Sequence, residues 1–234
     1  MSQTAGSGTG YEPDAEAVAK GTAIYTPRTL RLYDFVVHGL SNRFAWGCPT
    51  NALIGQYRDH ISDNHLEAGV GTGFFLDRLG ERSFRRLTLL DINPSCLALS
   101  AERLRRYSPE LVEASLFAPL PSDTPYDSIG LTYVLHCLPG AMPEKLQVID
   151  NLRPVMHAGT VLFGATILGS GIAPNPAAKA LMGAYNRRGV FDNLQDDMAA
   201  LAEGLRARFG QVSVSRRGCV ALFQASGPVS PDAA

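Results

Sequence analysis

Apolar and polar positions along this chain alternate between two periods. Short apolar runs bounded by turn-forming residues predict strands, and longer stretches with apolar residues three and four positions apart predict helices. The predicted strands are 65–68, 87–91, 111–115, 128–135 and 160–168. Between them the pattern predicts a helix through Phe75 and Leu79, a second over 93–107 and a third over 143–156. This alternation indicates a parallel sheet with helices on both faces.

The two ends of the chain depart from this pattern. After a helix predicted over 194–209, the runs 211–215 and 219–225 flank the tight turn Arg216-Arg217-Gly218 and predict an antiparallel hairpin. Before the first strand, helical spacing predicts helices within 29–48 and over 50–61, the second with Thr50 or Asn51 as N-cap. The predicted fold class is α/β: a doubly wound, mostly parallel seven-stranded sheet with a C-terminal antiparallel hairpin strand.

Length and composition fit one large domain. A chain of 234 residues with 45% hydrophobic content can bury one substantial core. The first residues are rich in Gly, Ser, Thr and Ala, as expected of a mobile segment. We expect residues 1–62 to form a flexible N-terminus and a helical lid, and residues 63–234 to form the core, with a lid insertion around 170–192.

Charge and cysteine usage exclude several classes of partner. The net charge is −1 and the arginines occur in scattered pairs, which argues against nucleic-acid and membrane partners. The four cysteines form no CxxC pair and are expected to be reduced thiols. Since no apolar run approaches about 18 residues and no signal peptide is recognised, we expect a cytoplasmic protein, either a monomer or a homodimer.

The segment "HLEAGVGTGFF", residues 65–75, is the strongest indication of a binding site. Gly69, Gly71 and Gly73 follow a predicted strand, where backbone turns sharply or a ligand approaches closely. A dinucleotide fingerprint needs G-x-G-x-x-G, whereas the spacing here is G-x-G-x-G. Asp91 ends the second strand, where a carboxylate can accept both hydroxyls of a ribose. The pattern therefore predicts an adenosine-type ligand.

Five segments together carry a resemblance to a known family. They are the run Glu67 to Gly73, "DINP" from Asp91, Ser115-Leu116, Tyr126-Asp127 leading into "LTYVLHCL", and "LRPVMHAGTVLFGATIL". In this order the chain resembles the class I S-adenosylmethionine-dependent methyltransferases over about residues 60 to 225. The segments "YNRRGVFDN" and "GCVALFQA" also look like small bacterial or fungal members of natural-product pathways.

The resemblance implies a Rossmann-like core, S-adenosyl-L-methionine as cofactor and a set of ligand residues. Glu67 and the loop with Gly69, Gly71 and Gly73 would hold its methionine part, and Asp91 would bind the ribose hydroxyls. The remaining expected cofactor contacts are Ile92, which would pack on adenine, Ser115 and Leu116 at its edge, and Thr132. The family usually has Asp where this chain has Glu67 and Ser115. Glu67 keeps the charge, whereas Ser115 changes how the adenine amino group could be recognised.

Methyl transfer requires mainly that acceptor and methyl group are placed close together in a dry site. His136, after the fourth strand, is the best-placed candidate base, although for this residue type a histidine that only packs or bonds to backbone is the more common case. Predicted substrate contacts, at the predicted lid segments and after the fourth strand, are Tyr25, Tyr33, Trp46, His136, Tyr185 and Asn186.

The predicted function is methyl transfer to O, N or C of a small aromatic or apolar metabolite. A metal-assisted mechanism needs clustered carboxylates, and since only Asp127 lies near the expected region, we predict no metal. Two alternatives stay open. One is a cyclase or pericyclase that retains the cofactor as a positive charge, and the other is a binding module with a decayed site.

Overall fold

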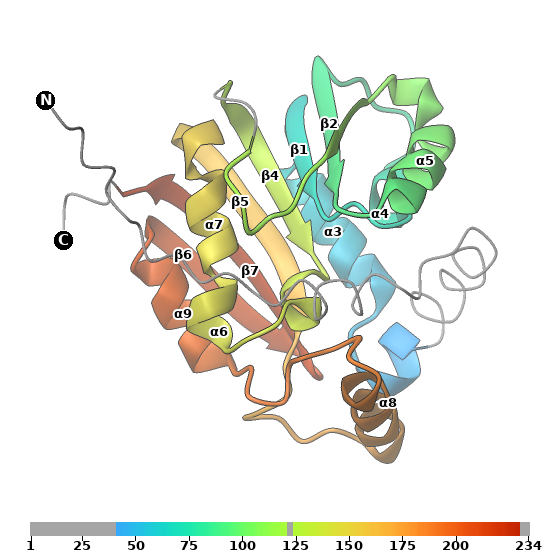
Figure 1. Cartoon of the computed structure of the whole chain (residues 1–234), viewed down its shortest axis with the longest axis vertical. Helices are drawn as coiled ribbons and strands as arrows, with labels where there is room; N and C mark the ends of the chain where they lie inside the picture. The colour runs from blue at the N-terminus through green and yellow to red at the C-terminus, as the bar shows by residue number, and fades with distance from the viewer. Residues whose placement is uncertain (1–40, 121–123, 230–234) are drawn as a thin grey trace, which may run out of the picture.

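The structure is a computed structural model that describes residues 41–120 and 124–229 (Figure 1). The strands are β1 Asn64–Ala68, β2 Arg86–Asp91, β3 Glu110–Glu113, β4 Tyr126–Thr132, β5 Met156–Ile167, β6 Phe209–Arg217 and β7 Val220–Pro228. The helices are α3 Thr50–His60, α4 Phe74–Asp77, α5 Pro94–Arg103, α6 Met142–Lys145, α7 Gln147–Leu152, α8 Pro176–Arg187 and α9 Met198–Arg206. Short 3-10 helices cover Arg105–Tyr107, Leu135–Cys137 and Arg153–Val155.

The strands form one seven-stranded sheet in the order β3-β2-β1-β4-β5-β7-β6. The pairs from β3 to β5 are parallel, whereas β7 runs antiparallel to both of its neighbours, β5 and β6. The predicted fold class is therefore confirmed. The strand order reverses between β1 and β4, and in doubly wound sheets ligands bind beside the carboxyl ends of the strands at this point.

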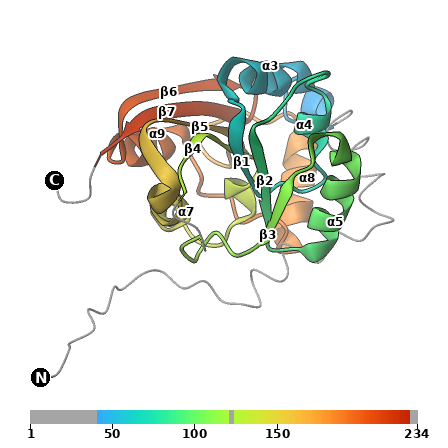
Figure 2. The same cartoon turned by 90° about the horizontal axis from the view of Figure 1, so that it is seen from above.

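Helices cover both faces of the sheet (Figure 2). Buried side chains of α3, α4 and α5 pack on one face, and those of α6, α7 and α9 pack on the other. Helix α8 lies beyond the strand ends and adds Ala178 and Met182 to the first core (Figure 1). Strand residues alternate between these two cores: Phe163 of β5 belongs to the first and the adjacent Leu162 to the second. Helix α3 lies directly on the sheet, where Gln56 donates to the carbonyls of Gly164 and Phe223.

Several element boundaries differ from the sequence prediction. The helix after the glycine loop spans only Phe74–Asp77, and the long helix expected over 143–156 is divided into α6, α7 and a 3-10 turn containing Pro154. The N-cap of α3 is Pro49, not Thr50 or Asn51. Helix α9 begins only after Asp197, whose side chain caps the amide of Ala200.

Helix α8 lies inside the predicted lid insertion and was not predicted as a helix. Asn175 caps it by accepting from the amide of Ala178, and Pro176 occupies its first turn. The domain limit at residue 62 and the two lid segments stay predictions. Of the helix expected within 29–48, the part before residue 41 falls outside the described residues. No helix in the described ranges is long and apolar enough to cross a membrane.

Candidate active site

A pocket lies at the carboxyl ends of β1, β2 and β4, where the strand order reverses. Its lining includes every predicted cofactor residue except Gly73, and we call this set the glycine-loop group: Glu67, Gly69, Gly71, Asp91, Ile92, Ser115, Leu116 and Thr132. Gly73 instead packs against α5, because a Cβ on Gly73 would lie 3.1 Å from the Cβ of Ser100. Segments far apart in the sequence are thus brought to one cavity.

The glycine loop turns sharply at Gly69. Its φ of +74° belongs to the left-handed region, and a Cβ added there would lie 2.5 Å from Cγ2 of Val134. The amides of Gly69 and Val70 both donate to the carbonyl of Leu90, at 2.8 and 3.1 Å. The loop is therefore fixed to the end of β2 and lies tightly against the segment that follows β4.

Asp91 is fixed by backbone donors on both carboxylate oxygens. Oδ2 accepts from the amide of Gly71 and Oδ1 from that of Asn93, each at 2.9 Å. Burial raises the pKa of Asp91, while backbone hydrogen bonds from Asn93, Gly71 and Ile92 oppose that rise. A carboxylate oxygen has a second acceptor site, so this group can still bind two hydroxyls of a ligand.

The expected adenine contacts surround the mouth of the pocket on the β2 and β3 side. Ile92 has 40% of its surface exposed, which leaves an apolar face available for a flat ring. The hydroxyl of Ser115 accepts from the amide of Phe117 at 3.2 Å, and the carbonyl of Leu116 accepts from Asn151 at 2.9 Å. The loop after β3 is therefore held in place by its own turn and by α7.

Glu67 and Thr132 supply buried polar atoms at the pocket floor. Glu67 is 4% exposed and accepts hydrogen bonds from the Tyr57 hydroxyl and from Nε2 of His65. The hydroxyl oxygen of Thr132 is buried and, although it lies near the Tyr57 hydroxyl, makes no hydrogen bond of good geometry among the described residues. Such an oxygen is destabilising unless a ligand or water satisfies it, which fits a polar ligand in this pocket.

A second set of pocket residues was not predicted from the sequence. We call it the apolar group: Phe74, Phe75, Tyr133, Val134, Cys137, Leu138 and Pro139. Tyr133 has φ +62°, unusual for a residue with a side chain, and its hydroxyl donates to Asn42 at 2.8 Å. Its position directly after a strand ending at the pocket was the available signal. Burial raises the pKa of Cys137 to about 12, so its thiol stays neutral.

His136 is buried beside the pocket and does not line it. The amide of Ile167 donates to its Nδ1 at 3.3 Å, and its ring packs against Phe191 with centroids 4.5 Å apart. Burial, with a smaller effect of Lys145, lowers the pKa of His136 to about 3. The imidazole is therefore neutral at physiological pH and a weak base.

The other predicted substrate residues lie behind the lining. Trp46 is 1% exposed and packs on Phe191, as does Tyr185. Asn186 donates to Met182 and to the Asn193 side chain, so it ties α8 to the segment that returns toward α9. Tyr25 and Tyr33 fall outside the described residues.

A buried ion pair holds that returning segment. Nζ of Lys145 lies 2.6 and 2.8 Å from the two carboxylate oxygens of Asp196 and also donates to the carbonyl of Asp192. Burial raises the pKa of Asp196, and the Lys145 ammonium opposes that rise. The amide of Asp192 donates in turn to the carbonyl of His136 at 3.0 Å. The ion pair therefore also supports the turn that follows β4.

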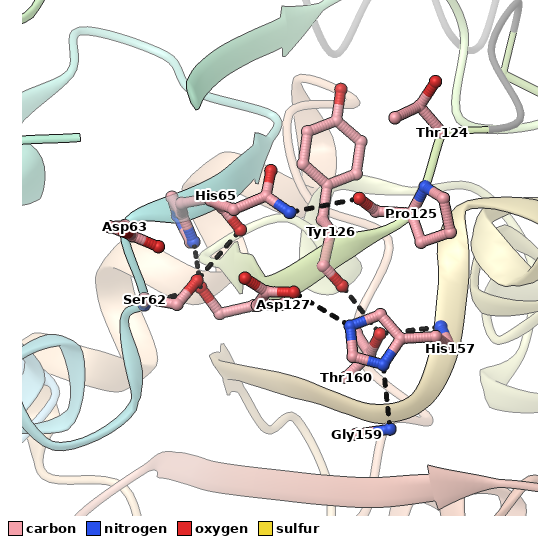
Figure 3. Close-up of polar contacts among 12 residues, drawn as sticks. Ser62, Asp63, His65, Thr124, Pro125, Tyr126, Asp127, His157, Gly159 and Thr160 are labelled. Carbon is pink, nitrogen blue, oxygen red and sulfur yellow. Dashed lines mark hydrogen bonds and ion pairs between the residues drawn. The ribbon is translucent and has the colours of Figure 1, made fainter. Parts of the chain in front are cut away.

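Asp127 does not lie near the pocket, contrary to its expected region. It is at the start of β4, whereas the pocket is at the end of that strand. Figure 3 shows Asp127 facing His157, whose Nε2 lies 2.9 Å away, and Arg85 contacts it at 3.0 Å. Across the described ranges no three His, Cys, Asp or Glu side chains come together as a potential metal site.

Comparisons with known proteins agree with this geometry. A family model described as "Methyltransferase domain" matches residues 66–162. The demethylluteothin O-methyltransferase of Streptomyces thioluteus is 36% identical over 227 residues, which cover 96% of this chain and 98% of the relative. The Physcion biosynthesis cluster O-methyltransferase of Aspergillus chevalieri is 34% identical and covers 92% of this chain and 99% of its own length.

A solved structure supports the fold. The complex of DhpI with S-adenosyl-L-homocysteine (SAH) superposes on this chain with a TM-score of 0.65, at 15% identity. The match covers 93% of this chain and 100% of that chain. This structural similarity concerns the fold alone, whereas the sequence relatives extend over nearly the whole chain. The chain belongs to the class I S-adenosylmethionine-dependent methyltransferases.

Proposed function

We propose that this methyltransferase transfers its methyl group to an acidic oxygen, of a phenol or an enol, on a small and largely apolar molecule. The observation that carries this proposal is the apolar group of the pocket lining. Its side chains offer a dry surface for a flat acceptor, and the described part of the lining offers that acceptor no free base. An acceptor that ionises by itself fits such a site best.

The cofactor fits the glycine-loop group. S-adenosylmethionine supplies an electrophilic methyl group on a sulfonium when it is bound. Asp91 would accept the ribose hydroxyls, Ile92 would cover one face of the adenine, and Glu67 would hold the ammonium of the methionine part. Thr132, whose buried hydroxyl makes no hydrogen bond of good geometry among the described residues, would bind a polar atom of that same part.

The chemistry of the described residues favours positioning over acid–base catalysis. Glu67 and Asp91 are already committed to protein donors, and burial keeps the Cys137 thiol neutral. The expectation that His136 acts as a base has no test yet. Its lowered pKa and its place behind the lining instead favour a supporting role. We propose that the acceptor reacts as its anion, with its proton lost to solvent.

Relatives support an oxygen acceptor and a biosynthetic setting. Both curated relatives described above are O-methyltransferases, and one is assigned to a biosynthesis cluster. We therefore place this enzyme in secondary metabolism. A cytoplasmic location and a monomeric or homodimeric state stay predictions.

The first experiment is calorimetric titration of the purified protein with S-adenosylmethionine and its demethylated product, with NAD as control. We expect micromolar binding of the first two and none of NAD. Tight NAD binding without sulfonium binding would refute the ligand assignment of the glycine-loop group.

The second experiment is an acceptor screen. Phenols and enols are incubated with protein and S-adenosylmethionine beside aliphatic alcohols and amines of similar size, and the demethylated cofactor product is measured by mass spectrometry. Turnover confined to amines would overturn the oxygen assignment. An acceptor that is converted while the cofactor is left intact would instead establish the cyclase alternative.

A further inference from the structure

The Glu67 carboxylate lies between the sheet and α3, with only a small exposed remainder at the pocket. Side chains alternate along β1, so Glu67 and His65 point to the same face, the one that α3 covers. Glu67 is 4% exposed and His65 is fully buried. A buried carboxylate is strongly destabilising without donors, so its hydrogen-bond partners decide how it is oriented.

The first partner is Tyr57 of α3. Its hydroxyl lies 2.5 Å from Oε1 of Glu67, and its ring is held between Phe75, stacked at 5.4 Å, and Phe163, edge-on at 5.0 Å. Burial, followed by the charge of Glu67, raises the pKa of Tyr57 well above its usual value. The hydroxyl therefore stays protonated and donates a hydrogen bond to the carboxylate.

The second partner is His65, whose orientation is set from the neighbouring strand. Nε2 lies 3.0 Å from Oε2 of Glu67, and Nδ1 lies 2.8 Å from the hydroxyl of Ser128, the cross-strand neighbour of His65. The amide of Ser62 donates to that hydroxyl at 2.8 Å, and Figure 3 shows Ser62 beside His65. Because Nε2 faces a carboxylate oxygen, it carries a ring proton. Nδ1 contacts the Ser128 hydroxyl, which also lies 2.8 Å from the Ser62 hydroxyl.

Gly130 supplies the space that the carboxylate occupies. It is the β4 partner of Glu67 in the parallel ladder. A Cβ on Gly130 would lie 2.5 Å from Oε2 of Glu67 and 3.3 Å from Cε1 of His65. Any other residue at this position would displace the carboxylate from both of its donors.

We infer that Tyr57, His65 and Gly130 are positioning residues that aim the Glu67 carboxylate at the cofactor's ammonium, with Ser128 orienting the histidine ring. The inference rests on the proposed role of Glu67 in cofactor binding. None of these residues lines the described pocket, so each acts through Glu67. The recognition of the cofactor's amino group thus extends to α3 and β4.

A double-mutant cycle tests this assignment. The dissociation constant for S-adenosylmethionine is measured by calorimetry for the wild type, Tyr57→Phe, Glu67→Gln and the double variant. We expect Tyr57→Phe to raise the constant about tenfold in the wild-type background, as for loss of a hydrogen bond to a charged group, and less than about twofold beside Glu67→Gln. Tyr126→Phe, which removes a buried hydroxyl bonded to Thr88, is the matched control and should leave binding unchanged.

A second pair of variants keeps the test independent of Glu67→Gln. The amide of His65→Gln can donate from nearly the position of Nε2, whereas His65→Leu cannot. We expect His65→Leu to raise the KM for cofactor about tenfold with little change in kcat at saturation, and His65→Gln to restore most of that loss. Gly130→Ala should raise the same KM.

The outcomes separate the inference from the proposed function. If the wild type does not bind S-adenosylmethionine, the proposed function fails. If it binds but the Tyr57 and Glu67 effects are additive, or His65→Leu and His65→Gln lose affinity equally, the positioning assignment is overturned. Thermal unfolding of each variant identifies losses that come only from misfolding.

Discussion

The two groups that line the pocket are built differently. The glycine-loop group contains charged and backbone polar atoms, and its carboxylates are fixed by donors such as the amides of Gly71 and Asn93. The apolar group contains aromatic and aliphatic side chains and a neutral thiol, and its Tyr133 has a strained backbone. A ligand shared by a whole family needs fixed polar partners, whereas the contacts that select an acceptor can be apolar shape alone. Variants in each group should therefore affect different ligands.

The largest effect is expected from Asp91, one of the two carboxylates of the glycine-loop group. Asp91→Ala would remove the two charge-assisted hydrogen bonds that we propose to the cofactor's ribose, each contributing about 1.5–3 kcal/mol, and should raise the dissociation constant for S-adenosylmethionine at least ~100-fold. Calorimetry measures it, with Asp127→Ala at the far end of β4 as control. Normal binding by Asp91→Ala would remove this residue from the site.

The next effect separates strain from close approach in the glycine loop. Gly69 and Gly80 have nearly the same φ, +74° and +76°, but only Gly69 has a neighbour within 4 Å of an added Cβ. Gly80→Ala should therefore lower the free energy of unfolding by only about 1–2 kcal/mol, the strain of a left-handed residue.

Gly69→Ala adds a clash with Val134 to that strain. It should be less stable than Gly80→Ala. Because the clash displaces the loop, we expect it to bind S-adenosylmethionine roughly tenfold more weakly, which corresponds to about 1.4 kcal/mol. Adding Val134→Ala should recover part of both losses. Equal behaviour of the two alanine variants in denaturant unfolding would contradict the close approach.

A smaller effect should appear on the acceptor alone. Leu138→Ala removes apolar contact area from the apolar group and should raise the KM for the acceptor about fivefold, while the dissociation constant of the cofactor changes less than about twofold. Leu111→Ala, on the exposed edge strand, is the control. A cofactor effect as large as the acceptor effect would show that the two groups are not separate in function.

The smallest effect at neutral pH concerns His136. Its pKa falls from 6.5 to about 3 on folding, so the folded state binds fewer protons than the unfolded state between these values. Its stabilising contribution is complete above about pH 6.5 and is lost as the pH falls toward about 3. Wild-type stability should therefore fall more steeply over this range than that of His136→Asn.

The same pair of proteins tests His136 in catalysis. Denaturant unfolding between pH 3 and 8 measures how the stability of each protein changes with pH. For catalysis, kcat is measured between about pH 6 and 9. We expect the wild type and His136→Asn to have pH profiles of the same shape. An inflection in the wild-type profile that the variant lacks would restore the histidine as the catalytic base.

Sequence patterns predicted the features whose signals are local. The Asn93-Pro94 start of α5, the glycine loop and the acid at the end of β2 each lie within a few residues of the strand end that gives them meaning. The same Asn-Pro signal marks Asn175 and Pro176, and helix α8 was still missed because its segment was interpreted only as an insertion.

Features created by long-range packing could not be predicted in this way. The Tyr57 contact to Glu67 depends on where α3 lies on the sheet, and the packing of His136 depends on Phe191, which comes from a distant segment. Asp127 was misplaced for a simpler reason. A residue at the start of a parallel strand lies at the edge opposite the ligand, and the predicted strand 128–135 already placed Asp127 at that end.

The insertion of β7 between β5 and β6 has a consequence for synthesis on the ribosome. Strand β5 contributes twelve residues to the sheet and pairs with β7 from Val161 to Ile167. During translation this apolar strand has no partner on that side until residue 228 has left the exit tunnel, and an unpaired edge is a template for aggregation. Cotranslational folding of this enzyme thus waits for its C-terminal hairpin, and a shortened chain ending before β7 would be exposed to chaperones and proteases.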